Sequence, residues 1–151
     1  LREELKLIQN YLNIQSMRLQ RFQFELEVPE AMLSLKIPRL LLQPLAENAV
    51  VHGVENSVRP GVILVKGVQD PGINRITVDD NGQGITDEKL AALQAKLTMP
   101  MDENTGTGLW NIHQRLIHMY GGKSGLVFAK SPLGGMRVEL IWENEEEEEK
   151  R

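Results

Sequence analysis

The spacing of apolar residues changes several times along the chain, and each change marks an expected helix or strand. Between residues 2 and 20, apolar side chains recur three to five positions apart, which is the spacing of a helix with one buried face. Over residues 22–28, apolar and polar side chains alternate instead, which predicts a strand that Pro29 ends.

A second helix is expected over residues 39–52. Pro38 suits the start of a helix and Gly53 suits its end. Pro44 lies early in this segment and is expected to bend the helix, because proline lacks the backbone N–H and its ring crowds the preceding turn.

In the second half of the chain, strand-like and helix-like patterns follow one another, separated by turns rich in Gly and Pro. The expected elements are a strand at 62–68, a turn at 70–72, a strand at 75–79, a helix capped by Thr86, a helix at 109–120, and a hairpin that pairs 126–129 with 136–142. Residues 98–107 are polar and have no period, and we expect a mobile loop there.

This order of elements predicts an α+β fold. Strands that follow one another can pair antiparallel, and the helices are numerous enough to cover one face of a sheet. We therefore expect a two-layer α/β sandwich with a mixed, mostly antiparallel sheet covered on one face by helices, not a doubly wound parallel sheet. Residues 1–142 are expected to form one domain, and the acidic residues 143–151 a disordered tail.

Composition narrows the functional classes. The chain has 151 residues and a formal net charge of -4, all of it in the tail, so the remainder is balanced with 15 acidic and 15 basic residues. This balance gives no electrostatic reason to expect a nucleic acid or an anionic membrane as a partner. The absence of cysteine excludes disulfides and thiol chemistry, and no apolar run reaches membrane-spanning length. Because Leu1 falls inside an expected helix, we interpret the chain as a fragment of a longer protein.

Asp80 and the glycines after it form the first candidate site. Asp80 follows an expected strand, and a carboxylate at a strand end can accept a hydrogen bond from an exocyclic amine such as that of adenine. Gly82 and Gly84 carry no side chains, so a flat ring could lie against the backbone. The alternatives are a plain Asp-Asn-Gly turn and a functional role for Asp79 instead.

Two further features indicate phosphate and metal binding. Gly106 and Gly108 come just before a helix, where free backbone N–H groups favour phosphate, although a flexible loop end would also use glycine. Asn48 lies inside an expected helix, a poor position for Asn, which indicates either a buried hydrogen bond or a Mg²⁺ ligand. His52 lies four residues further on the same face, where it could reach the same phosphates or act as a cation at the helix end.

Taken together, three segments resemble the ATP-binding motifs of the LytS-type sensor histidine kinases of bacterial two-component systems. Residues 43–53 resemble the N box, residues 80–84 the G1 box, and residues 106–112 the G2 box. The resemblance extends over residues 1–142. It implies the GHKL, or Bergerat, ATP-binding fold that is shared with gyrase B, Hsp90 and MutL.

This resemblance implies ATP and Mg²⁺ as cofactors and gives roles to individual residues. Asn48 would hold Mg²⁺, Asp80 would bind the adenine amine, and residues 85–107 would form the ATP lid. Asn48, Glu47 and His52 are the catalytic candidates, with Glu47 supporting Asn48 from the position before it. The candidate ATP contacts are Asn48, His52, Asp80, Gly82, Gly84, Ile85, Thr105, Gly106, Thr107, Gly108 and Leu109.

In such kinases the γ-phosphoryl group passes from ATP to a histidine on a separate dimerisation helix pair, and then to an aspartate of a response regulator. The resemblance therefore implies ATP, a phosphoacceptor segment of the same kinase and a response-regulator receiver domain as partners. The sequence contains no segment of the phosphoacceptor type Pro-His-Phe-Leu-Phe-Asn, and residues 1–20 are expected to be the helix that leads in from it. The whole protein is expected to be a homodimer attached to the inner membrane, with this domain in the cytoplasm.

Three positions depart from the family pattern. Val51 stands where lysine is usual, so one phosphate contact is either absent or supplied by His52. Met136 follows Gly135 where threonine is common, which removes a hydroxyl near adenine. Pro44 occupies the place of the glutamate that activates water in the ATPases of this fold, which argues against hydrolysis. The remaining alternatives are a GHKL-type ATPase and a degenerate domain that binds nucleotide only as a regulatory element.

Overall fold

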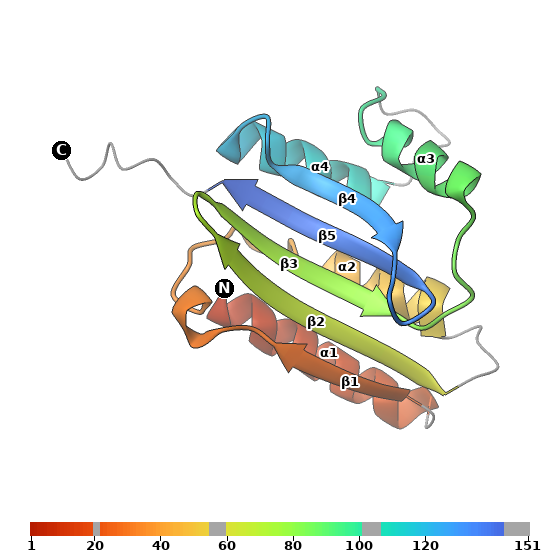
Figure 1. Cartoon of the computed structure of the whole chain (residues 1–151). Coiled ribbons are helices and arrows are strands. Elements are labelled where there is room, and N and C mark those ends of the chain that lie inside the picture. The colour runs from red at the N-terminus through yellow and green to blue at the C-terminus, as the bar shows by residue number, and fades with distance from the viewer. Residues whose placement is uncertain (20–21, 55–59, 101–106, 144–151) are drawn as a thin grey trace.

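The computed structural model describes residues 1–19, 22–54, 60–100 and 107–143. Apart from one short 3-10 turn, its helices and strands follow the predicted order (Figure 1). They are α1 (Arg2–Leu19), β1 (Phe22–Glu27), the 3-10 turn η1 (Glu30–Met32), α2 (Gln43–Asn48), the π-helical segment η2 (Ala49–Val54), β2 (Gly61–Asp70), β3 (Ile73–Asp80), α3 (Asp87–Lys96), α4 (Thr107–Tyr120), β4 (Gly125–Lys130) and β5 (Met136–Glu143).

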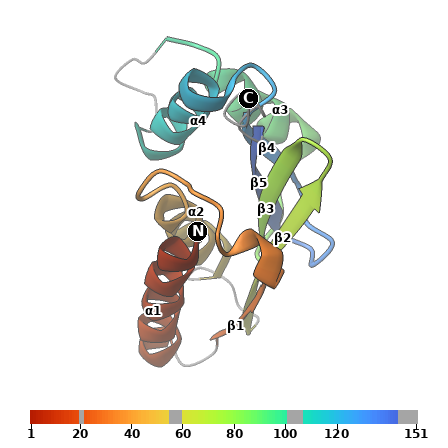
Figure 2. The ribbon, with the colours of Figure 1, turned by 90° about the vertical axis from the view of Figure 1, so that its left-hand side faces the viewer.

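The five strands form one mixed sheet in the order β1-β2-β3-β5-β4. β1 runs parallel to β2, and every other neighbouring pair is antiparallel. Figure 2 shows the sheet nearly edge-on, with α1, α2 and α4 on the same side of it. The predicted two-layer sandwich with a mostly antiparallel sheet is therefore confirmed.

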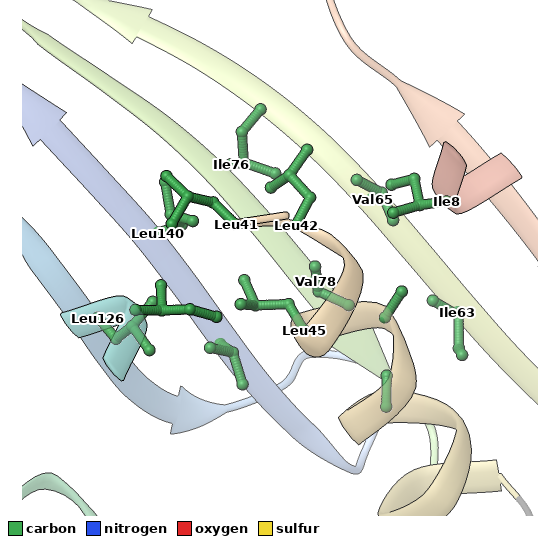
Figure 3. Close-up of a cluster of buried hydrophobic side chains, with 14 of the residues drawn as sticks. Ile8, Leu41, Leu42, Leu45, Ile63, Val65, Ile76, Val78, Leu126 and Leu140 are labelled. Carbon is green, nitrogen blue, oxygen red and sulfur yellow. The ribbon is translucent and has the colours of Figure 1, made fainter. Parts of the chain in front are cut away.

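The hydrophobic core lies between the sheet and these helices. Alternate residues of β2 and β3 point toward the helices because successive side chains of a strand face opposite ways. Leu45 of α2 and Ile8 of α1 are almost fully buried against this face (Figure 3). The strand residues labelled in the drawn cluster are Ile63, Val65, Ile76, Val78, Leu126 and Leu140.

The helix that was predicted over 39–52 begins later than expected and ends differently. Leu40 has a φ of 61°, a left-handed backbone that cannot continue a right-handed helix. The helix therefore starts at Gln43, and Pro44 lies in its first turn, where its missing N–H breaks no helical hydrogen bond. Gly53 does not end it, because the backbone widens into the π-helical η2, which runs to Val54.

α3 is capped and anchored by polar side chains. The hydroxyl of Thr86 accepts a hydrogen bond from the Lys89 N–H at 3.2 Å, which confirms the predicted cap. The Gln94 amide donates to the Leu126 carbonyl at 2.9 Å and accepts from the Phe128 N–H at 2.8 Å. Gln94 thus pairs with β4 much as a neighbouring strand would, and it holds α3 at that edge of the sheet.

Two of the expectations from the sequence concern residues that the structure does not describe. Residues 101–106 of the expected mobile loop and residues 144–151 of the acidic tail lie outside the described residues. Within the described ranges, no helix combines the length and hydrophobicity of a membrane span.

Candidate functional site

Two adjoining cavities lie where α2 and η2, α3 and α4 come together with the sheet. The smaller one, which we call the Asp80 cavity, has a volume of about 290 Å³ and the larger, the Lys96 cavity, about 410 Å³. These volumes are typical of small ligand sites. The Asp80 cavity is lined by Asn48, His52, Asp80, Gln83, Gly84, Ile85, Lys89, Leu93, Leu109, Phe128 and Met136. The Lys96 cavity is lined by Pro44, Glu47, Asn48, Val51, His52, Leu93, Lys96, Leu97, Gly108, Leu109, Trp110 and Phe128.

Asp80 ends β3 with its carboxyl group almost completely buried. Its Oδ1 accepts hydrogen bonds from the backbone N–H of Gly82 at 2.9 Å and of Met136 at 3.1 Å. Burial raises the pKa of this carboxyl above its ordinary value, and the two backbone bonds only partly oppose that shift. No described residue donates a hydrogen bond to Oδ2, so one oxygen of Asp80 is available to a ligand in the cavity.

Asp79, the alternative acid, has a different partner. Both of its carboxylate oxygens bind the Arg137 guanidinium, at 2.8 and 3.1 Å. This bidentate ion pair joins β3 to β5, and Asp79 lines neither cavity. Of the two adjacent acids, only Asp80 is therefore positioned to bind a ligand there.

Three glycines allow the backbone to close around the Asp80 carboxyl. A Cβ on Gly53 would lie 2.6 Å from Asp80 Oδ2, and a Cβ on Gly135 would overlap Oδ1. A Cβ on Gly82 would overlap the backbone of Gly53, so Gly82 packs against the end of η2 and lines neither cavity. Gly84 does line the Asp80 cavity and has a φ of 82°, a backbone that favours glycine.

The three residues expected to take part in catalysis lie together on α2 and η2. Asn48 is half-buried and lines both cavities, and no described residue forms a hydrogen bond with its amide. Glu47 is exposed at the Lys96 cavity, where it accepts a hydrogen bond from Gln43 at 3.3 Å. His52 is exposed, lines both cavities, and lies near enough to Asp80 to lower the pKa of that carboxyl slightly.

The residues expected at the phosphates are only partly described. Gly108 and Leu109, in the first turn of α4, line the Lys96 cavity, and Ile85 lines the Asp80 cavity. Thr107 is the first residue of α4. Thr105 and Gly106 lie outside the described residues.

The site also contains side chains that the sequence analysis did not single out. Lys89, Leu93 and Lys96 come from α3, where their spacing of four and three residues places them on one helix face. Phe128 comes from β4. The spacing on α3 was visible in the sequence, and the family resemblance placed residues 85–107 in an ATP lid, but neither signal singled out these three side chains. Among the described residues, no cluster of three or more His, Asp or Glu side chains could hold a metal ion.

Comparison with known proteins gives consistent matches. The family model for histidine kinase-, DNA gyrase B- and HSP90-like ATPases matches residues 35–146. The chain is 32% identical to the sensor histidine kinase YesM of Bacillus subtilis over 91% of this chain and 22% of YesM. It is 34% identical to the sensor protein LytS of Oceanobacillus iheyensis over 90% of this chain and 24% of LytS. The chain thus spans about a quarter of the length of these relatives.

Solved structures show the same fold. The catalytic domain of the histidine kinase ThkA superposes with a TM-score of 0.70 at 14% identity, covering 93% of this chain and 92% of that domain. ThkA in complex with the response regulator protein TrrA gives a TM-score of 0.69 at 15% identity, covering 98% of this chain and 41% of the ThkA chain. At this level of identity, the likeness establishes the fold.

Proposed function

Since this chain belongs to the family of histidine kinase-, DNA gyrase B- and HSP90-like ATPases, we propose that it binds ATP and donates the γ-phosphoryl group to a histidine of a sensor kinase. The resemblance to LytS-type kinases predicted from the sequence is confirmed by the LytS relative named above. The observation that best supports the proposal is the position of Asp80. Its carboxyl is buried, one oxygen is available, and Asn48 lines the same cavity.

The Asp80 cavity suits the adenine ring. Oδ2 of Asp80 would accept a hydrogen bond from the exocyclic amine, while Oδ1 is held in place by Gly82 and Met136. Apolar side chains that would cover the ring line the rest of the cavity; they are Ile85, Leu93, Leu109, Phe128 and Met136. Met136 stands where threonine is common; its backbone N–H, which does not depend on the side chain, donates to the carboxyl.

The Lys96 cavity suits the phosphates. Gly108 in the first turn of α4 lets phosphate oxygens approach backbone N–H groups, which the helix dipole favours. His52 lines this cavity as well, and we place it at the phosphates. Glu47 lies beside Asn48 on the same wall, and we assign it to supporting that amide.

The residues present fit a Mg²⁺ ion that is held mainly by ATP. The amide of Asn48 has no hydrogen-bond partner among the described residues, and its oxygen is a hard ligand of the kind that Mg²⁺ takes. Since the described residues offer no cluster of acidic or histidine ligands, Asn48 would be the main protein ligand, with phosphate oxygens and water completing the shell. When bound, Mg²⁺ neutralises charge on the phosphates during transfer.

The partners follow from the same proposal. The acceptor would be a histidine on a phosphoacceptor segment, and the domain would position the γ-phosphoryl group for its attack. The response-regulator complex of ThkA supports a receiver domain as the next acceptor. A homodimeric kinase attached to the membrane, with this domain in the cytoplasm, is the arrangement that we propose for the whole protein. Pro44 at the first turn of α2 supplies no carboxylate to activate water, which favours phosphoryl transfer over hydrolysis.

Calorimetric titration with a non-hydrolysable ATP analogue tests the binding step. We expect Mg²⁺-assisted binding by the wild-type chain and a large loss in Asp80→Asn. Asp70→Asn is the matched control, because Asp70 is an exposed acid at the far end of β2 that lines neither cavity. Absence of binding by the folded wild-type chain would overturn the proposal.

Radiolabelled ATP tests the transfer step. We expect label to pass to an added helix pair from a LytS-type kinase that carries the acceptor histidine, and not to a copy in which that histidine is replaced by glutamine. Steady ATP turnover without the acceptor would instead support an ATPase. Tight binding with neither transfer nor turnover would support a regulatory domain.

A further inference from the structure

We propose that Lys96 of α3 binds the ATP phosphates from the side of the cavity opposite η2. The inference rests on the proposed function and adds a residue to it. Val51 and Lys96 line the same cavity, from η2 and α3 respectively, together with Asn48 and Gly108. A positively charged side chain at position 51 of η2 or position 96 of α3 would therefore lie at the Lys96 cavity.

The charges around the Lys96 cavity support this assignment. Among its lining residues, Glu47 is acidic, His52 is titratable, and Lys96 alone carries a permanent positive charge. A triphosphate carries several negative charges, and Glu47 adds one more on the same wall. An ammonium group on the flexible lysine stem can follow phosphate oxygens as a point charge, which is a common role of lysine at phosphate sites.

Lys96 is also available for binding. Its side chain is exposed, and no described acidic residue forms an ion pair with it. By contrast, Lys130 on the nearby β4 is paired with Asp87 at 2.9 Å. Lys96 therefore has no described partner to lose when it turns toward a phosphate.

The backbone at Lys96 is held against α4. The Gln114 amide donates to the carbonyl of Leu97 at 2.7 Å, and the Trp110 indole donates to the carbonyl of Met99 at 2.8 Å. Both donors come from α4, whose first turn carries Gly108. These two bonds hold the segment that directly follows Lys96 against α4, and so keep the end of α3 beside the cavity that both helices line.

Lys96 has a second possible role, as a cation in the last turn of α3 that stabilises the helix dipole. The two roles predict different effects on stability and on ATP affinity. A dipole role affects the stability of α3 and is independent of ATP. A phosphate role affects ATP affinity and its dependence on salt, because an ion pair with phosphate is weakened by screening.

The test uses Lys96→Met, which keeps most of the stem and removes the charge. Lys123→Met is the control, because Lys123 is exposed and lines neither cavity. With a Mg²⁺-bound non-hydrolysable ATP analogue, we expect roughly tenfold weaker binding for Lys96→Met, since a charged contact of about 1.4 kcal/mol corresponds to tenfold in Kd. We expect a change of less than about twofold for the control, a flatter salt dependence for Lys96→Met alone, and nearly unchanged melting temperatures.

A rescue variant makes the test sharper. Adding Val51→Lys to Lys96→Met should restore most of the lost affinity, because position 51 lines the same cavity. Equal affinities of Lys96→Met and Lys123→Met would overturn the inference, as would a loss that the Val51→Lys change cannot restore. If Asp80→Asn abolishes binding while Lys96→Met does not change it, the proposed function stands and this inference fails. Absence of binding by the wild-type chain would overturn both.

Discussion

Replacing Asp80 with asparagine should separate ATP binding from stability. Asparagine keeps an oxygen in the position of Oδ1, so the bonds from Gly82 and Met136 at 2.9 and 3.1 Å can persist. What changes is the other oxygen, which becomes an NH₂ group that cannot accept from the adenine amine. A hydrogen bond to a charged group contributes about 1.5–3 kcal/mol, so Kd for ATP should rise by roughly 10- to 150-fold.

Although the Asp80→Asn variant should bind ATP more weakly, its free energy of unfolding should not decrease. Burial raises the pKa of Asp80 in the folded chain, so between about pH 3.8 and that raised value the folded state binds more protons than the unfolded one. The free energy of unfolding therefore falls as pH rises through this window, because the folded wild type increasingly bears the cost of a buried charge. Asparagine removes that cost, so the variant should be at least as stable as wild type at pH 7.

Two measurements check this reasoning. Urea denaturation at pH 7 and pH 4 should show the variant equal to or above wild type at pH 7, with the difference shrinking at pH 4. Calorimetry should show that the ATP affinity of wild type declines on acidification as Asp80 is protonated, beyond any decline seen in the variant. A variant that binds ATP as tightly as wild type would refute the adenine assignment. A variant that loses both affinity and stability would show that the carboxylate serves the fold.

Two further changes test other parts of the site, and a third prediction concerns a buried histidine outside it. Asn48→Ala should leave stability nearly unchanged, because no described residue binds the amide, and titrations should show that Mg²⁺ no longer improves ATP affinity. Gly53→Ala should destabilise the fold by about 1–3 kcal/mol in urea denaturation and weaken ATP binding, because its Cβ would displace the Asp80 carboxyl. Gly122→Ala, where a Cβ meets nothing within 4 Å, should be neutral in both assays. Burial lowers the pKa of His113, so the unfolding free energy should fall as pH drops below about 6.5, with a shallower slope in His113→Gln.

The fold was largely predictable because its signals are local. The alternation at 22–28 and the hairpin of β4 and β5 follow from a period of two, and Thr86 is a cap that the first turn of α3 needs. The start of α2 was not predictable in the same way. Leu41 and Leu42 are both buried although they are adjacent, and this depends on packing against distant strands that no local pattern reports.

In the candidate site, too, local features were predictable and those that depend on distant residues were not. The motif around Asp80 indicated an acid at a strand end, but it could not distinguish Asp80 from Asp79. That choice depends on Arg137, a partner 58 residues away in the sequence, which occupies Asp79 completely. Lys96 was missed for a similar reason, since a helix face can be predicted without knowing which cavity it lines.

The π-helical segment η2 shows how one local distortion joins the separate motifs. Within it, Gly53 lies so close to Gly82 that a Cβ on Gly82 would overlap the Gly53 backbone, and a Cβ on Gly53 would overlap the Asp80 carboxyl. That contact holds the end of the helix next to the end of β3, and so places Asn48 and Asp80 on the walls of one cavity. A regular α-helix rotates each residue by a fixed step, and the widened turn alters that step just after Asn48. The sequence had indicated that Gly53 ends the helix. The structure shows instead that glycine is needed there because the backbone approaches the Asp80 carboxyl closely.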